Sequence, residues 1–339
     1  MKVALFGAGR IGKVHAASIA ADPDSRLVAV TDVVPDAARD LAARHGAEMR
    51  EPGDILADPA VDAILIASST DTHADLIEAG IAAGKAIFCE KPIDLDLARA
   101  RKVAAAAAGH DRPVMVGFNR RFDPQFASLK AALDAGQIGR GEMLAVTSFD
   151  PAPPPLDYVR VSGGLFRDMT IHDFDICAFL FGLPHRLSAH GACLIDPAVA
   201  ATGDVDTAVV VMDYADGRIA TIRNSRRAAY GYDQRVEVLG ADGMLELRNV
   251  AEDALVRSTE AGVTSAKPVH FFLERYARAY AIEWAAFVAA CRDGTPVPAT
   301  VQDGVNALAM AEAANRSLAT GRPVEMSAAL TGAAPTDGG

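Results

Sequence analysis

The sequence predicts an α/β protein in which a domain built on a parallel sheet precedes an α+β domain. Strand and helix patterns alternate up to about residue 119, which is typical of a parallel sheet with helices on both faces. Two hairpin signatures later follow each other with no helix between them, which indicates an open, largely antiparallel second sheet. The 339 residues, 50% of them hydrophobic, suffice for two domains, which we expect over residues 1–120 and 121–330.

The first strand and the loop after it predict a dinucleotide-binding site. A strand at Lys2–Phe6 and a helical pattern at 14–21 enclose Gly-Ala-Gly-Arg-Ile-Gly, which is G-x-G-x-x-G in its expected context. The first glycine permits the tight turn, the second lets a pyrophosphate approach, and the third allows close packing of helix and strand. The helix N-terminus adds unpaired N–H groups, which predicts a Rossmann dinucleotide-binding domain. The expected cofactor contacts in this loop are Gly7, Ala8, Gly9, Arg10, Ile11 and Gly12.

An acidic residue after the second strand predicts NAD rather than NADP as the cofactor. The strand 27–31 is followed by Asp32, about twenty residues beyond the glycine loop, where an acid is expected to bind the adenosine ribose. Its carboxylate accepts hydrogen bonds from a 2′-hydroxyl but repels a 2′-phosphate, and Val33 and Val34 supply no cation. The alternative is that Asp32 only caps the turn into a helix that begins near Pro35.

Three further strands, 63–67, 86–89 and 114–118, complete the predicted parallel sheet, and helical stretches separate them. Ligands of such sheets bind beyond the carboxyl ends of the strands. The remaining candidates for cofactor contact follow the third and fourth strands: Ser68, Thr70, His73, Glu90 and Lys91.

The pattern changes after residue 121. The expected elements are helix 126–135, strand 142–149, a stiff proline-rich connection at 150–155, a helix from 168 to 181, hairpins 207–224 and 235–248, and helices 271–291 and 302–320. The prediction leaves open whether the C-terminal helices pack back on the first domain. Residues 331–339 are expected to form a flexible tail.

Composition excludes several classes of protein. The net charge of −11 disfavours nucleic-acid binding, and the local cluster at 223–227, with three arginines, is interpreted as a subunit or domain contact. No apolar run approaches the length of a membrane span, and Met1 leads directly into the first strand, so we expect a cytoplasmic protein. The four cysteines are scattered without a C-x-x-C pair, which fits reduced, mostly buried thiols better than disulfides or a zinc cluster.

Asp168, His172 and Asp175 are spaced to lie on one face of a helix. An alcohol that gives a hydride to nicotinamide must also lose its hydroxyl proton, which needs a general base and a group that stabilises the developing alkoxide. His172 is the predicted base, since its reference pKa of about 6.5 suits neutral pH. Asp168 would orient it, and Lys91 would hold the substrate hydroxyl.

Alternatives remain for each of these residues. Asp168 is also a good helix N-cap, His172 can be a structural histidine, and Lys91 can be a surface residue before Pro92. Asp168, His172 and Asp175 could together ligate zinc or manganese, although a nearby lysine would repel a metal, so no metal is expected. Folds of this kind also host non-catalytic sensors that bind dinucleotide or sugar.

The chain resembles the family of glucose–fructose oxidoreductases, inositol dehydrogenases and their relatives over nearly its whole length. The glycine loop extended to Lys-Val-His, the Glu90-Lys91-Pro92 triplet and the Asp168–His172 pair are similar to that family's fingerprint, lysine motif and catalytic pair. The stretches that resemble its inositol dehydrogenases are 117–123, 166–175, 230–235 and 271–280. The family often has Thr-Pro-Asn after the third strand, where this chain has Ser69-Thr70-Asp71.

The resemblance implies NAD-dependent oxidation of a ring hydroxyl of myo-inositol to an inosose, with Lys91, Asp168 and His172 as the catalytic triad. Scyllo-inositol, D-glucose or another polyol stays open as the substrate. Family members commonly form tetramers through the open face of the second-domain sheet. By motif position, the resemblance also implies substrate contacts at Arg121, Asp150, Asp175 and Tyr232.

Overall fold

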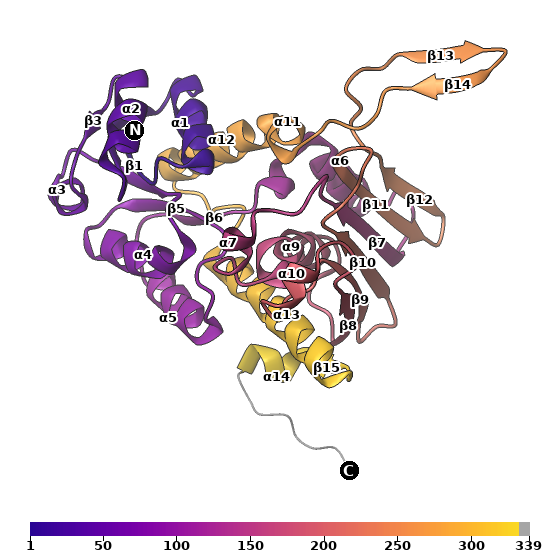
Figure 1. The fold of residues 1–339 in the computed structure, drawn as a ribbon. Coiled ribbons are helices and arrows are strands. Elements are labelled where there is room, and N and C mark those ends of the chain that lie inside the picture. Colours follow the sequence, from indigo (N-terminus) through magenta and orange to yellow (C-terminus); the bar gives the residue numbers. More distant parts are fainter. Residues whose placement is uncertain (332–339) are drawn as a thin grey trace. The chain divides into compact units, whose positions relative to one another are not determined.

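The computed structural model describes residues 1–331, which divide into two compact units (Figure 1). The first comprises Met1–Asp123 and Arg278–Leu308, and the second comprises Pro124–Ala277 and the chain from Ala309 onward. Thr331, where the expected flexible tail begins, is the last described residue and is helical, and the rest of that tail lies outside the described residues. Among residues 1–331, none of the helices combines the length and hydropathy that a membrane crossing requires.

A six-stranded parallel sheet forms the centre of the first unit and confirms the predicted α/β arrangement. Its strands are β1 (Lys2–Phe6), β2 (Arg26–Thr31), β3 (Glu48–Met49), β4 (Ala63–Ile66), β5 (Ala86–Glu90) and β6 (Val114–Gly117), in the order β3-β2-β1-β4-β5-β6. Every residue of β4 is buried, as in a strand covered on both faces. The two-residue β3 was not predicted, because so short a strand has no periodicity to detect.

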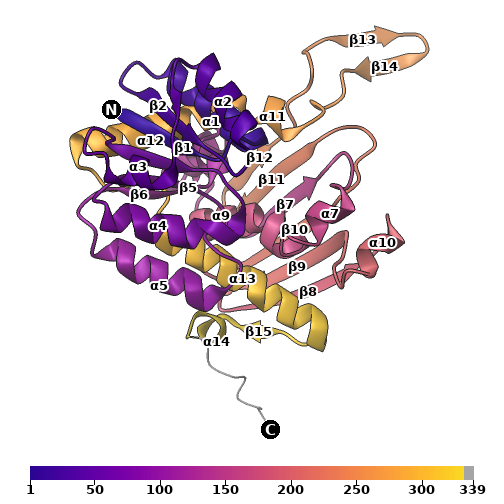
Figure 2. The ribbon, with the colours of Figure 1, turned by 60° about the vertical axis from the view of Figure 1, so that its left-hand side comes forward.

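Helices cover both faces of this sheet. Right-handed crossovers on either side of β1 place α1 (Arg10–Ala21) and α2 (Pro35–Arg44) on one face and α4 (His73–Ala82) and α5 (Leu97–Ala108) on the other (Figures 1 and 2). The short elements α3 (Pro52–Ala57), η1 (Thr70–Thr72) and η2 (Asn119–Phe122) lie in the connections.

A segment from the end of the chain completes the first core. Within α12 (Ala277–Asp293), the Trp284 and Phe287 rings pack edge-on against Phe88 of β5, with centroids 6.0 and 5.7 Å away. The Trp284 indole N–H donates to the Ser25 hydroxyl at 2.9 Å. Tyr276 separates α12 from α11 (Phe272–Arg275), so the expected single helix over 271–291 is wrong.

The second unit contains a seven-stranded sheet with one parallel pair. Its strands are β7 (Gly141–Phe149), β8 (Arg186–Ala192), β9 (Thr207–Asp213), β10 (Ile219–Ser225), β11 (Asp233–Gly240), β12 (Gly243–Leu247) and β15 (Val324–Glu325), in the order β12-β11-β7-β10-β9-β8-β15. Both predicted hairpins, β9–β10 and β11–β12, are confirmed. They do not lie next to each other, since β7 lies between them, antiparallel to β11 and parallel to β10.

Helix α9 packs against β7 and β10. The helices of this unit are α6 (Pro124–Asp134), α7 (Leu156–Val159), α8 (Leu165–Asp168), α9 (Thr170–Phe181), α10 (Pro197–Ala200), α11, α13 (Val301–Thr320, which begins in the first unit) and α14 (Met326–Thr331). The hairpin of β13 (Val256–Thr259) and β14 (Gly262–Ser265) extends away from the rest of the unit (Figures 1 and 2).

The predicted helix over 168–181 is interrupted. Asp168 is the last residue of α8, and α9 starts at Thr170. The Asp168 N–H donates to Gly164 O and the Met169 N–H to Leu165 O, which completes α8. The alternative that Asp168 is a helix N-cap is therefore wrong, because Met169 occupies the cap position of α9. Asp168 and His172 do not share one continuous helix.

Candidate active site

The glycine loop after β1 has the shape that a bound pyrophosphate needs. Gly7 has a φ of +106°, and a side chain on Gly12 would collide with the Gly7 carbonyl oxygen. In contrast, a Cβ on Gly9 would have nothing within 4 Å, so this position leaves room for a ligand. Gly9 is also the N-cap of α1, with no side-chain cap and no acid in the first turn. The open space at Gly9 and the N-terminus of α1 fit a dinucleotide pyrophosphate.

Asp32 follows β2 beside this loop. Its carboxylate accepts hydrogen bonds from the Ala8 N–H at 2.6 Å and from the Val34 N–H at 2.8 Å. The second bond is the turn interaction considered as the alternative for Asp32. A carboxylate has about four acceptor positions, so both bonds leave capacity for ribose hydroxyls. The next side chain, Val33, is 97% exposed, so the first position after the acid presents an uncharged side chain to solvent.

Glu90 is the last residue of β5, and a buried histidine holds its carboxylate in place. The His15 Nε2 lies 2.7 Å from a Glu90 carboxylate oxygen, and the His15 ring is edge-on to Phe88 and Tyr280. The other carboxylate oxygen accepts the Lys91 backbone N–H at 3.2 Å. The contacts of Glu90 therefore fix the backbone from which the half-buried Lys91 side chain extends.

His73 connects the ends of two neighbouring strands. Its Nδ1 lies 2.8 Å from the Pro92 carbonyl oxygen, and its Nε2 lies 3.2 Å from the Ser68 carbonyl oxygen. Burial lowers the pKa of His73, which favours the neutral ring. The Ser68 hydroxyl is 2.6 Å from that of Thr72. Through these contacts His73 links the segment after β4 to the segment after β5. Its contact with the cofactor stays a prediction.

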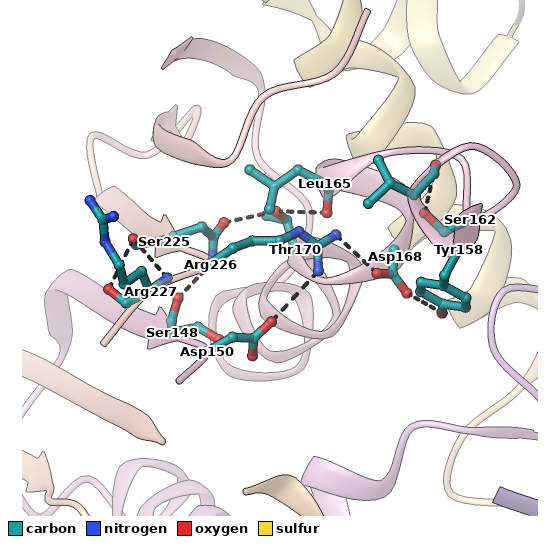
Figure 3. A network of polar contacts seen from close by, with 12 residues as sticks. Ser148, Asp150, Tyr158, Ser162, Leu165, Asp168, Thr170, Ser225, Arg226 and Arg227 are labelled. Atoms are coloured by element: carbon teal, nitrogen blue, oxygen red, sulfur yellow. Dashed lines mark hydrogen bonds and ion pairs between the residues drawn. The ribbon is translucent and has the colours of Figure 1, made fainter. Parts of the chain in front are cut away.

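In the second unit, Asp150 and Asp168 lie on either side of a buried arginine (Figure 3). The Arg226 Nη2 donates to Asp168 Oδ2 at 3.0 Å, and Nη1 lies 3.6 Å from Asp150 Oδ2. The Tyr158 hydroxyl donates to Asp168 Oδ1 at 2.8 Å. The structure thus brings together two acids that were predicted separately.

Sequence reasoning missed Arg226, which was interpreted as part of a subunit or domain contact. It is 3% exposed and its partners Asp150 and Asp168 belong to its own unit, so that interpretation is wrong for this residue. A signal was present, because Ala220, Ile222 and Asn224 of β10 are buried at alternate positions and Arg226 continues the series. Burial opposes the charge of Arg226, but Asp168 and Asp150 outweigh it and raise its pKa above the ordinary value.

Asn224 fixes the first turn of α9, which carries His172. The Thr170 hydroxyl donates to Asn224 Oδ1 at 2.7 Å, and Asn224 Nδ2 donates to Asp173 Oδ2 at 2.7 Å. All three of these polar side chains are buried, and Thr170 and Asp173 lie on either side of the half-buried His172 along the helix. The site helix is therefore attached to β10 by hydrogen bonds as well as by apolar packing.

The other predicted substrate contacts have different surroundings. Asp175 is buried on α9, and Tyr232 is buried before β11 with its ring edge-on to Tyr276. Arg121, in η2 of the first unit, donates to the Pro298 carbonyl oxygen at 3.0 Å and lies 3.2 Å from Asp303. These bonds give Arg121 a structural role, and its contact with substrate stays a prediction.

The described residues show no clustering of three or more His, Cys, Asp or Glu side chains that could hold a metal. All four cysteines are free thiols, two buried and two half-buried. Burial raises the pKa of Cys89 and Cys177 well above the usual value, so both remain protonated and unreactive.

Two family descriptions match the chain. Residues 1–118 match the oxidoreductase family with NAD-binding Rossmann fold, and residues 126–246 match the GFO/IDH/MocA C-terminal domain. The chain is 48% identical over 328 residues to inositol 2-dehydrogenase of Rhizobium meliloti (strain 1021), with 96% of this chain and 99% of the relative covered. It is 33% identical over 336 residues to scyllo-inositol 2-dehydrogenase (NAD(+)) of Bacillus subtilis (strain 168), with 96% of each covered.

The fold agrees with these matches. The crystal structure of a myo-inositol dehydrogenase from Corynebacterium glutamicum superposes with a TM-score of 0.92 at 43% identity, covering 96% of this chain and 98% of that one. The family resemblance seen in the sequence is confirmed, as are the Rossmann domain and the largely antiparallel second sheet, which contains one parallel pair. The chain belongs to the GFO/IDH/MocA family and is an NAD-dependent oxidoreductase that acts on CH–OH groups.

Proposed function

We propose that this enzyme oxidises a ring hydroxyl of myo-inositol to the 2-keto inosose with NAD⁺. The observation that carries the proposal is the arrangement of Asp150, Asp168 and the His172 helix around β10 in the second unit. A ring with six hydroxyls is recognised by several charged partners, and this arrangement supplies them. Inositol 2-dehydrogenase of R. meliloti, 48% identical, adds support.

In the proposed mechanism, His172 accepts the proton of the reacting hydroxyl as its carbon gives up a hydride. NAD⁺ supplies the hydride acceptor when it is bound. Asp168 stabilises the imidazolium that forms, and Lys91 stabilises the developing alkoxide. The product is a ketone, the proton remains on His172, and the base is regenerated when that proton passes to water.

A parallel rate assay tests the substrate. Purified protein is given myo-inositol, scyllo-inositol or D-glucose with NAD⁺, and initial NADH formation is followed by absorbance. We expect the highest kcat/KM for myo-inositol. Scyllo-inositol is the second candidate, because the B. subtilis relative that acts on it is 33% identical over 96% of this chain. Activity on another polyol alone would keep the mechanism and change the substrate, whereas inactivity on all polyols would refute the proposal.

Asp32 is expected to make NAD⁺ the preferred cofactor. Its carboxylate, held by the Ala8 and Val34 N–H groups, would repel a 2′-phosphate. The wild-type kcat/KM should therefore be higher with NAD⁺ than with NADP⁺. Asp32→Ala should lower the ratio of the NAD⁺ value to the NADP⁺ value. Asp36→Ala, which removes an exposed acid of α2, is the control and should leave the ratio unchanged. Equal wild-type efficiency with both cofactors would contradict the role of Asp32.

The open face of the second sheet is proposed to bind another copy of this chain. Met143 pairs in register with both Ile219 and Leu239, and Leu239 pairs with Met244, so the four apolar side chains share one face and are 40–54% exposed. Such a contiguous apolar strip is typical of an interface. The tetramer implied by the resemblance and the cytoplasmic location both stay predictions.

Replacing Leu239 with lysine should lower the mass measured by light scattering, because a buried charge weakens an apolar interface. Leu255→Lys, on the exposed segment before β13, is the control and should keep the wild-type mass. A monomeric wild type, or an unchanged Leu239→Lys mass, would contradict this interface.

A further inference from the structure

The parallel pairing of β7 with β10 places Arg226 beside Asp150. Phe149 is opposite Ser225 in the register, so the next residue of each strand leaves the sheet at the same edge. The Asp150 N–H donates to Ser225 O at 2.9 Å, and the Ala228 N–H donates to Asp150 O at 2.7 Å. The backbone around the Arg226–Asp150 contact is thus fixed by the sheet.

The separation of Asp168 and His172 depends on contacts with this fixed part of the sheet. The two residues lie on different helices, because α8 ends at Asp168 and α9 begins two residues later. One continuous helix therefore does not fix their separation. Instead, Asn224 of β10 binds both Thr170 and Asp173 of α9. Arg226, two residues further along the chain, binds Asp168 of α8 (Figure 3).

We propose that Arg226 is a positioning residue for the oxidation, which holds Asp168 in register with the His172 helix and keeps Asp150 beside it. The inference rests on the proposed function. Two carboxylates gathered at one place repel each other, and the guanidinium offsets this repulsion with one terminal nitrogen toward each acid. Groups held in place before the substrate arrives need no reorganisation during the reaction.

Stability alone does not account for this arginine. Its side chain is only 4% exposed, and burying an ion pair loses about as much hydration energy as the attraction returns. Apolar packing would stabilise the position equally well. A lysine would fit less well, because its single nitrogen would have to lie close to both carboxylates, whereas the two terminal nitrogens of arginine each face one acid.

Three variants test the proposal against a wild type shown to oxidise a polyol. Arg226→Gln removes the charge, Arg226→Lys keeps it without the planar geometry, and Arg227→Gln changes the exposed neighbour as a control. We measure kcat, KM, the primary deuterium isotope effect with a polyol labelled at the reacting carbon, NADH affinity and the thermal midpoint.

For Arg226→Gln we expect kcat to fall about 10²-fold, as misplaced reacting groups typically cause. The isotope effect should rise, because the chemical step becomes more rate-limiting, while NADH affinity stays at the wild-type value. Arg226→Lys should recover part of the lost kcat, and Arg227→Gln should match the wild type in every measurement.

The outcomes separate the two proposals. A wild type that oxidises no polyol refutes the proposed function and the inference with it. An active wild type with an Arg226→Gln kcat within about threefold of its own overturns the role of Arg226 alone, as does an unchanged isotope effect. If Arg226→Gln does not fold, Arg226→Lys decides: a reduced kcat at unchanged NADH affinity supports the proposal, and a wild-type kcat overturns it.

Discussion

Replacing His172 with alanine is expected to lower kcat by about 10²- to 10⁴-fold, the usual contribution of a general base. His172 lies on the first turn of α9. Asn224 forms hydrogen bonds with Thr170 and Asp173, on either side of His172, so the substitution should leave the helix in place. The measurement is the steady-state rate of NADH formation from the best polyol, accompanied by NADH affinity and the thermal midpoint.

His190→Ala is the matched control for this variant. His190 is exposed on β8 of the same unit, so its removal should change neither kcat nor NADH affinity. If His172→Ala keeps near-wild-type turnover, the base is another group, and the proposed proton transfer is wrong even if the substrate is right.

Replacing Gly9 with alanine is expected to weaken NADH binding by about 10²-fold with little change in the thermal midpoint of the free protein. A Cβ at Gly9 meets no protein atom within 4 Å, and its φ of −70° suits alanine. The added methyl group would therefore contact only the bound pyrophosphate. Losing two hydrogen bonds to a charged group, each worth about 1.5 kcal/mol, gives roughly this factor. Fluorescence titration with NADH measures it.

Two other glycines serve as comparisons. Gly53→Ala in α3 also adds a methyl group in open space and should leave both stability and affinity unchanged. Gly12→Ala would collide with the Gly7 carbonyl oxygen and should lower stability as well as affinity. Wild-type NADH affinity in Gly9→Ala would place the pyrophosphate elsewhere.

The first unit was largely predictable because its signals are local. Apolar strands such as β4 are buried over their full length, and the spacing of Gly7, Gly9 and Gly12 reports contacts within one loop. The bounds of β1 were predicted without error, and those of β2 and β5 to within one residue. The hairpins of the second unit were also predicted, since each turn lies between its own strands.

The features that could not be predicted from the sequence depend on contacts between residues that are distant along the chain. Nothing near Phe149 indicates that Ser225 will be its partner, because that register is decided by the packing of the whole sheet. The interruption at Met169 was hidden by an apolar pattern that continues through it. Arg226 was misjudged for the same reason, since a charged residue after a strand is usually exposed and its two acidic partners are far away in sequence.

The C-terminal contribution to the first core has a consequence for synthesis on the ribosome. Trp284 and Phe287 pack against Phe88, so the parallel-sheet unit lacks part of its core until the chain has been made beyond Phe287. The second unit also requires residues beyond Ala309, since the Ser317 hydroxyl accepts the Ala189 N–H. The nascent chain therefore cannot complete either unit until these late residues have been made, and its apolar strands stay partly uncovered until then.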